Sequence, residues 1–152
     1  MTGADKEKLR WEAKVAPRLW RRLFRRDRRA ELDPNRADLV VVVSSFDDAE
    51  ACSTALARAT GLTPDAPAVL RHHLRIPPQH VETVCAIAAQ DGYAPAPQVG
   101  GPGTDAFETV ILQRVQLLDA LHCAQERSRM AGLAQRHDGN ADGWDALQPS
   151  RV

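Results

Sequence analysis

The sequence predicts an α+β fold in which helices cover one antiparallel sheet. Aliphatic and β-branched runs that suit strands alternate with segments whose apolar residues recur at helical spacing. Prolines and glycines mark the boundaries between these segments. The chain has 152 residues, which is enough for one domain with a modest core. Neither kind of segment can bury its apolar side alone, so sheet and helices are expected to pack together.

Residues 1–33 are predicted to form a basic helical arm. Residues 1–30 hold eleven Lys and Arg against four Asp and Glu, a net charge of +7, whereas residues 31–152 hold nine against sixteen, a net of −7. On a helical projection of residues 18–29, all the arginines fall on one side and the large apolar residues on the other. The arginines are Arg18, Arg21, Arg22, Arg25, Arg26, Arg28 and Arg29. This charge asymmetry indicates an interaction tail.

Three uses of the arm remain open. It could dock on the body, either by its apolar side while its arginines face solvent, or through its arginines on an acidic patch of the same molecule. Alternatively, the arginines bind an anionic surface such as RNA or a ribosome. The third use is attachment to an anionic membrane surface, with Trp20 and Phe24 as anchors. The sequence has no uncharged apolar span of about twenty residues and no secretory signal pattern, so we expect a cytoplasmic protein without a membrane-crossing helix.

The body, residues 37–148, is predicted to begin with an additional strand and helix. Residues 39–43 are an unbroken aliphatic run, which predicts a strand covered on both faces that lies at or beside an edge of the sheet. Ser44 or Ser45, with Asp47 and Asp48, is expected to start the next helix, because their oxygens can accept its unpaired N–H groups. The inward residues of that helix are expected to be Cys52, Ala55, Leu56 and Ala59.

The central stretch, residues 68–97, carries the clearest pattern. Residues 68–76 suit a strand, and two prolines then stop the strand and suit the first turn of a helix. That helix places Val81, Val84, Cys85 and Ala88 on one face. Gly92 is suited to a left-handed cap at its end, and residues 93–98 are predicted to be extended.

The remaining chain completes a recognisable order of elements. After a flexible connection at residues 99–105, residues 107–118 are predicted to be a strand over their first two-thirds. Asp119 is expected to cap a helix to about residue 135, followed by a turn and a short extended segment around Trp144. The inward stripe of this helix is predicted to be Leu121, Ala124, Ser128, Ala131 and Ala134. From residue 68 onward the order is β-α-β-β-α-β, which matches the ferredoxin-like sandwich.

The sequence does not present a set of catalytic residues, so an enzyme is not expected. His72 and His73 are adjacent on a predicted strand and point to opposite faces, which argues against a shared metal ion. His80 adds no known metal-ligand spacing. We interpret Cys52, Cys85 and Cys123 as reduced thiols of an intracellular protein. Neither a metal nor a cofactor is expected.

Three short motifs carry a resemblance to a known family. Residues 69–84 read VLRHHLRIPPQHVETV, residues 91–93 read DGY, and residues 142–144 read DGW. In this order and spacing they resemble the regulator of ribonuclease E activity, B type, over residues 66–148. That family has a strand ending in His-His-Leu, a Gly-Tyr strand and a terminal Tyr-Asp-Gly-Trp. Ala141 stands here where the family usually has the Tyr.

The resemblance implies a ferredoxin-like bacterial regulator that binds ribonuclease E and inhibits RNA cleavage by protein–protein contact, without being an enzyme. The candidate partner-binding residues are His72, His73, Tyr93, Asp142, Gly143 and Trp144. Structural roles are an alternative for two of them. Trp144 would then be a core aromatic residue, and Gly143 a glycine that a turn requires. The oligomeric state is open.

Overall fold

The computed structural model describes residues 32–97 and 106–151. The predicted arm helix at 18–29, with all seven of its arginines, and the connection at 99–105 lie outside the described residues. The described helices and strands belong to the unit that begins at Asp33. They are β1 (Leu39–Ser45), α2 (Cys52–Arg58), β2 (Ala68–Ile76), the 3-10 turn η1 (Pro78–His80), α3 (Val81–Ala89), β3 (Ala94–Pro95), β4 (Glu108–Gln116), α4 (Ala120–Gln135) and β5 (Asn140–Pro149). The predicted α+β class is confirmed.

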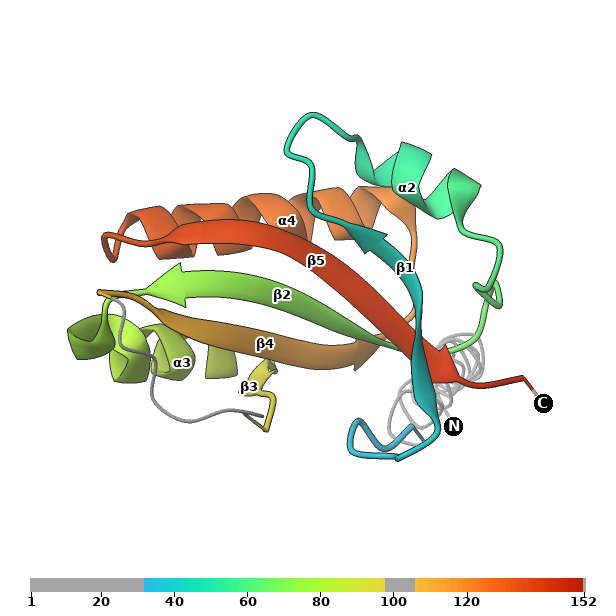
Figure 1. Ribbon diagram of the computed structural model, residues 1–152, viewed down its shortest axis with the longest axis horizontal. Helices are drawn as coiled ribbons and strands as arrows, with labels where there is room; N and C mark the ends of the chain where they lie inside the picture. The colour runs from blue at the N-terminus through green and yellow to red at the C-terminus, as the bar shows by residue number, and fades with distance from the viewer. Residues whose placement is uncertain (1–31, 98–105, 152) are drawn as a thin grey trace, which may run out of the picture. The chain divides into compact units, whose positions relative to one another are not determined.

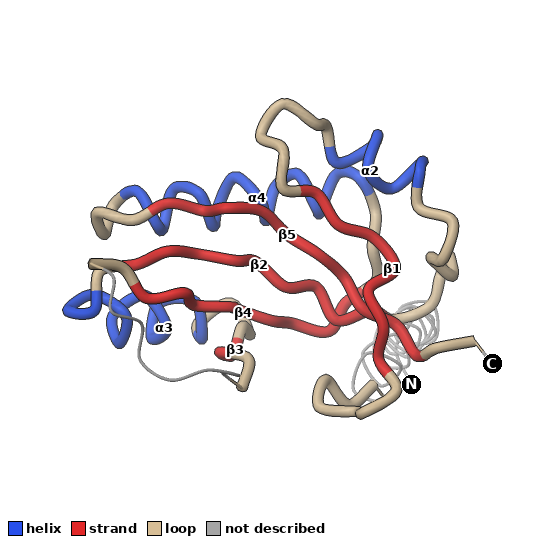
Figure 2. Tube along the Cα trace, viewed as in Figure 1, coloured by secondary structure: helices blue, strands red, loops and turns tan. Residues whose placement is uncertain are grey.

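The five strands form one sheet in the order β1-β5-β2-β4-β3, and every pair of neighbours is antiparallel. β2 is central and pairs along its whole length with β4, from Ala68 opposite Gln116 to Ile76 opposite Glu108. β1 lies at one edge, and the two-residue β3 at the other. Figure 2 shows the long strands running side by side as a single layer.

The helices pack on one face of this sheet. Val84 of α3 and Met130 of α4 join Leu74 and Leu112 of the sheet in one buried cluster. A second cluster gathers Cys52 and Ala55 of α2 with Val43, Leu70, Cys123 and Trp144. In Figure 1, β5 passes in front of α4, so the view is onto the other side of the sheet. We call that side the open face, because none of the described helices covers it.

Alternation along β2 decides which side chains reach each face, because successive residues of a strand point to opposite sides. Leu70, His72 and Leu74 face the helices and are fully or almost fully buried. Arg71, His73 and Arg75 alternate with them and lie on the open face, where they are half-buried or exposed.

Several local predictions are confirmed. The strand at residues 68–76 has the predicted bounds, and Val84 and Ala88 are the buried residues of α3. Gly92 has a φ of 82°, the left-handed conformation expected after that helix. Asp119 caps α4, since its carboxylate accepts a hydrogen bond from the backbone N–H of His122 at 2.8 Å.

Two predictions at the start of the body are wrong. The strand is not covered on both faces: Val40 is 44% exposed and Val41 51% exposed, because β1 is an edge strand with helices on one side only. Nor do Ser44, Ser45, Asp47 or Asp48 cap α2. That helix begins at Cys52 after Ala51, which makes no side-chain cap. The carboxylate of Asp47 instead accepts the N–H of Ala49 at 2.9 Å, in a turn that precedes the helix.

The last helix and strand also differ from expectation. The buried residues of α4 are Cys123, Glu126, Met130, Leu133 and Ala134. Of the predicted stripe only Ala134 is buried, and Leu121 is 64% exposed. The prediction failed because the polar residue Glu126 lies in the middle of the buried face and interrupts its apolar pattern. β5 is a full ten-residue strand instead of a short segment around Trp144.

Gly143 is a strand residue whose missing side chain makes room for the end of β1. A Cβ built there would lie 2.4 Å from Cδ1 of Phe46 and 2.5 Å from the backbone oxygen of Ser45.

We therefore expect Gly143→Ala to lower the free energy of unfolding by about 1–3 kcal/mol in urea denaturation. Gly132→Ala in α4 is the matched control, because its new Cβ would meet only the flexible end of Arg136 at 3.2 Å. That control should be neutral or stabilising by up to about 1 kcal/mol, since alanine favours a helix. Equal effects of the two substitutions would contradict this reason for Gly143.

Candidate partner-binding face and the polar cluster behind it

The structure separates the six candidate partner-binding residues into two groups. His72, Tyr93 and Trp144 are each at most 2% exposed and lie between the sheet and the helices. His73, Asp142 and Gly143 are half-buried, and His73 and Gly143 pair across β2 and β5 on the open face. A residue that solvent cannot reach cannot touch a partner docked on this surface. The candidate partner-binding residues are therefore reduced to His73, Asp142 and Gly143. The burial of Trp144 agrees with the alternative that it is a core aromatic residue.

An aspartate of β5 gathers two side chains of β2 on the open face. Arg71 donates two hydrogen bonds to the two carboxylate oxygens of Asp145, at 2.7 and 2.6 Å, and Nε2 of His73 lies 3.1 Å from Oδ2. Burial alone would raise the pKa of Asp145, but the hydrogen bonds from Arg71 and His73 outweigh it and hold that pKa below its ordinary value. Asp145 is therefore a fixed negative charge that holds both neighbours in place.

The open face continues past this trio with a second ion pair and an aromatic ring. Arg75 donates to Asp142 at 3.0 Å. Phe46, which is 55% exposed, lies with its ring centroid 5.1 Å from that of His73 in an edge-to-face arrangement. The close approach of Phe46 to Gly143 described above holds this ring over β5. An exposed aromatic ring beside ordered polar groups is typical of the anchors of protein interfaces.

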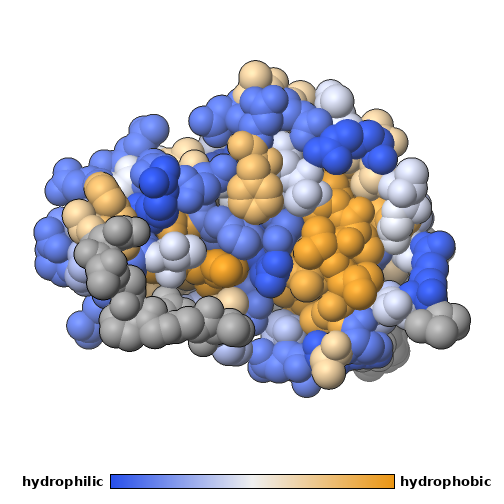
Figure 3. Space-filling model, in the orientation of Figure 1, coloured by the Kyte–Doolittle hydropathy of each residue, from blue (hydrophilic) through white to orange (hydrophobic). Residues whose placement is uncertain are grey.

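An apolar row adjoins the polar trio. Val41, Leu147, Val69 and Val115 lie side by side across β1, β5, β2 and β4. Val41 is 51% exposed and Leu147 and Val115 are half-buried, whereas Val69 is buried and adds no accessible surface. Figure 3, which views this face, shows hydrophobic surface gathered over β1 and the neighbouring part of β5, beside a more hydrophilic region. Contiguous apolar surface beside polar groups makes this part of the face a candidate contact site.

The charges of the open face favour a protein over a nucleic acid. The two arginines that the described strands place there, Arg71 and Arg75, are already paired with aspartates of the same face. A phosphate backbone needs unpaired cations, whose binding releases counterions. Neutralised polar groups beside apolar surface and an aromatic ring instead resemble the mixed composition of protein–protein interfaces.

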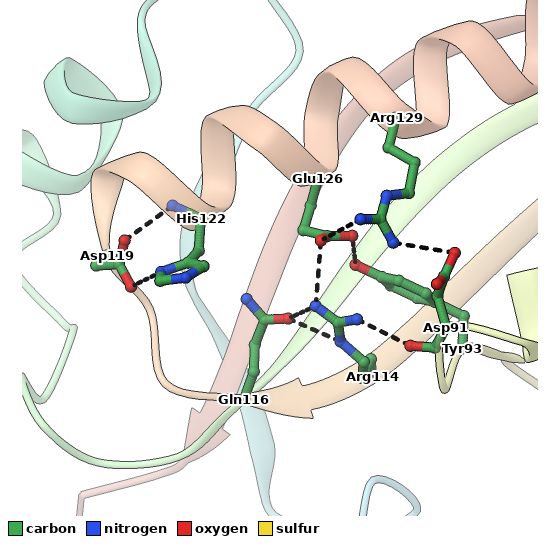
Figure 4. Close-up of polar contacts among 8 residues, drawn as sticks. All are labelled: Asp91, Tyr93, Arg114, Gln116, Asp119, His122, Glu126 and Arg129. Carbon is green, nitrogen blue, oxygen red and sulfur yellow. Dashed lines mark hydrogen bonds and ion pairs between the residues drawn. The ribbon is translucent and has the colours of Figure 1, made fainter.

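Behind the sheet, a polar cluster surrounds Glu126 of α4. Tyr93 donates to the Glu126 carboxylate at 2.7 Å, and Nη2 of Arg114 lies 3.5 Å from it. The Arg114 guanidinium also lies 4.5 Å from the centroid of the Tyr93 ring and donates to the backbone oxygen of Asp91 at 2.9 Å. Burial, followed by the hydrogen bond to Glu126, raises the pKa of Tyr93 well above its ordinary value. Figure 4 shows these side chains converging from α4, β4 and the turn after α3.

This cluster is best explained as a structural connection between α4 and the turn after α3. Arg129 of α4 extends it with an ion pair to Asp91 at 2.9 Å, so the cluster ties α4 to the turn after α3. A buried carboxylate that kept no such partners would be strongly destabilising. The cluster therefore explains why Glu126 is tolerated at a buried helical position.

His72 and Trp144 are cross-strand partners next to this cluster. The ring of His72 lies 5.7 Å from that of Tyr93, and Nε2 of His72 and Nε1 of Trp144 are buried without a hydrogen-bond partner. Burial lowers the pKa of His72 to about 4, and the charge of Arg114 acts in the same direction, whereas the charge of Glu126 opposes it. His72 is thus a neutral core residue at ordinary pH.

The described residues do not assemble a metal centre or an activated cysteine. No three His, Cys, Asp or Glu side chains within residues 32–97 and 106–151 are grouped so that they could hold a metal ion. All three cysteines are free. Burial raises the pKa of Cys123 to about 12 and also raises that of Cys85, so both thiols stay protonated near neutral pH and are poor nucleophiles.

A groove of about 570 Å³ lies between α2 and α4 on the helix side. It is lined by Ala124, Ser128 and Ala131 of the stripe that the sequence predicted to face the sheet, with Ala51 and Ser53 across from them. The small side chains of α4 therefore leave space beside α2 instead of allowing close contact with the sheet.

Sequence reasoning missed Arg71, Asp145, Phe46 and Glu126. A signal existed for one part of the face, since Arg71, His73 and Arg75 recur at every second position of a predicted strand and must share one side. Asp145 and Phe46 reach the same place only through the pairing of β5 with β2 and β1, which sequence spacing does not give.

A comparison of this chain with protein-family models, curated proteins and solved structures found no match. In the part of the chain that the structure describes, no helix has the length and apolar character needed to cross a membrane.

Proposed function

We propose that the body follows the ferredoxin-like plan, with β1 and α2 as an addition. Two features support this. From β2 onward the elements follow the order β-α-β-β-α-β, and their strands lie in the order β5-β2-β4-β3, all antiparallel. The two crossover helices, α3 and α4, share one buried cluster and hence one side of the sheet.

We further propose that this is a cytoplasmic regulatory protein, without catalytic activity of its own, that acts by binding another protein through the open face of its sheet. The observation that carries this proposal is the composition of that face: both arginines are neutralised, and an exposed Phe46 and an apolar row lie beside them. The motif resemblance suggests ribonuclease E or its assembly as the partner, and inhibition of RNA cleavage as the outcome.

The test uses purified ribonuclease E of the same organism and the full-length protein. We expect direct binding by calorimetry and a lower rate of RNA cleavage when the protein is added. Absence of binding, together with unchanged cleavage, would refute ribonuclease E as the target.

The second candidate function is association with RNA or a ribosome through the arginines of residues 18–29. The pairing of Arg71 and Arg75 favours the arm over the sheet as a phosphate-binding region. In the same assays, a protein lacking residues 1–30 separates the two candidates, since binding through the arm would be lost with it and would weaken steeply with salt. Flotation with anionic vesicles distinguishes the related proposal of membrane-surface attachment.

A further inference from the structure

Two of the three cysteines lie in the same buried cluster. Cys52 of α2 is 4% exposed and Cys123 of α4 is 1% exposed, and both pack in the cluster that contains Val43 and Trp144. Cys85 of α3 packs instead against the other cluster, whose buried residues include no cysteine. The fold therefore brings together one pair of free thiols from two helices that are far apart in the sequence.

Two further observations show that these two thiols are neighbours. α2 lies beside α4 (Figure 1), and the groove between them is lined by Cys52 together with Ala120 and Ala124, which flank Cys123 in the sequence of α4. Burial, followed by the charge that Cys52 carries when ionised, raises the pKa of Cys123 to about 12. A charge acts on a neighbouring group in this way only over a short distance, because the interaction weakens as the separation grows.

A small solute can reach Cys52 more easily than Cys123. Cys52 lines the groove of about 570 Å³, and it is the first residue of α2, which has seven residues and no side-chain cap at its start. Helix ends without such a cap fray, and fraying would widen the access to Cys52. Cys123 is almost fully buried within the longer helix α4. Cys52 is therefore the thiol of this pair that an external reagent meets first.

We propose that Cys52 and Cys123 form a redox-sensitive pair, in which a peroxide oxidises Cys52 and the pair then closes to a disulfide between α2 and α4. The proposal is independent of the proposed function. In the first step the Cys52 sulfur attacks one oxygen of hydrogen peroxide and the O–O bond breaks, which gives Cys52 sulfenic acid and one water.

In the second step the Cys123 sulfur attacks the Cys52 sulfur and the S–O bond breaks. The hydroxyl group leaves with the Cys123 thiol proton as a second water, so two thiols lose two electrons and one peroxide is reduced to two waters. The raised pKa makes Cys123 a poor nucleophile towards external reagents. Its place beside Cys52 makes this step intramolecular, and a high effective concentration offsets the low reactivity.

Peptide mapping of the full chain after treatment with hydrogen peroxide tests this proposal. We expect the free thiols to fall from three to one, the mass to decrease by two hydrogens, and the peptides of Cys52 and Cys123 to be linked. Cys85 is the internal control, because it lies in the other cluster and should remain a thiol. Dithiothreitol should restore all three thiols. In concentrated urea the preference for this pair should disappear, since the fold that brings the two thiols together is lost.

Two variants test the order of the steps. Cys123→Ser should leave Cys52 as a sulfenic acid that dimedone captures, whereas Cys85→Ser should form the same link as the unmodified chain. If Cys123→Ser fails to fold, the map of the unmodified chain decides alone. Preferential oxidation of Cys85, links between different molecules, or Cys52 oxidised without a link would overturn the proposal. Survival of all three thiols in the folded protein would overturn it as well.

Discussion

Replacing Trp144 by alanine should lower the free energy of unfolding by about 3–5 kcal/mol, because the indole is 1% exposed and its removal leaves a large cavity. Trp144 packs in the cluster that joins α2, α4 and the sheet, with Leu70, Ala55 and Cys123 around it. No neighbouring element can collapse into that space without losing its own contacts. Urea denaturation followed by circular dichroism measures the change.

Two further variants decide between a core role and a surface role for this tryptophan. Trp144→Phe should be much milder than Trp144→Ala, since it also removes an N–H group that is buried without a partner. Phe46→Ala should cost less than about 1 kcal/mol, because Phe46 is 55% exposed. If Trp144→Ala proved as mild as Phe46→Ala, Trp144 would have to be reassigned to the surface.

We also expect the free energy of unfolding to fall as the pH is lowered from about 6.5 to 4, because of the buried His72. Burial lowers the pKa of His72 to about 4 in the folded protein, whereas an unfolded histidine titrates near 6.5. Between these two pH values, His72 binds a proton in the unfolded chain but not in the folded chain, so the free energy of unfolding falls as pH falls. The contribution of His72 over this window is about 3 kcal/mol.

A comparison of variants isolates His72 from the other titrating groups. The free energy of unfolding of His72→Leu should lose most of this dependence between pH 6.5 and 4, and that of His73→Gln should retain it. Asp145 has a lowered pKa, so its contribution is lost at lower pH, below the ordinary value for an aspartate. An unchanged pH profile in His72→Leu would show that His72 is not the neutral buried group described here.

The sequence predicted correctly those elements that are determined by neighbouring residues, and it failed where distant contacts decide the structure. β2, α3, the Gly92 cap and the Asp119 cap each depend on neighbouring residues, and all four are confirmed. The place of β1 at an edge of the sheet, which was expected from the order of elements, is confirmed, but its apolar run predicted burial on both faces, and the edge position leaves Val40 and Val41 exposed. The buried face of α4 was missed because Glu126 is stabilised by residues far away in the sequence, chiefly Tyr93.

The candidate site was harder to predict for the same reason. The two histidines of residues 72–73 were expected to point to opposite faces, and the structure places His72 in the core and His73 on the open face. The motif residues Tyr93 and Trp144 drew attention as short signatures, but they are core residues. Short sequence motifs that contain aromatic residues often mark packing, because such residues bury large areas. The contact residues themselves, such as Phe46, follow from strand pairing.

The most direct test of the central claim, that the open face is the partner-binding surface, compares two exposed apolar residues on opposite sides of the sheet. Phe46 is 55% exposed on the open face, and Leu121 is 64% exposed on α4. Calorimetry with purified ribonuclease E should show that Phe46→Ala weakens binding about tenfold or more, the loss expected of an aromatic anchor, while Leu121→Ala leaves it unchanged. The opposite pattern, binding that survives Phe46→Ala and is lost with Leu121→Ala, would place the surface on the helix side and contradict the claim.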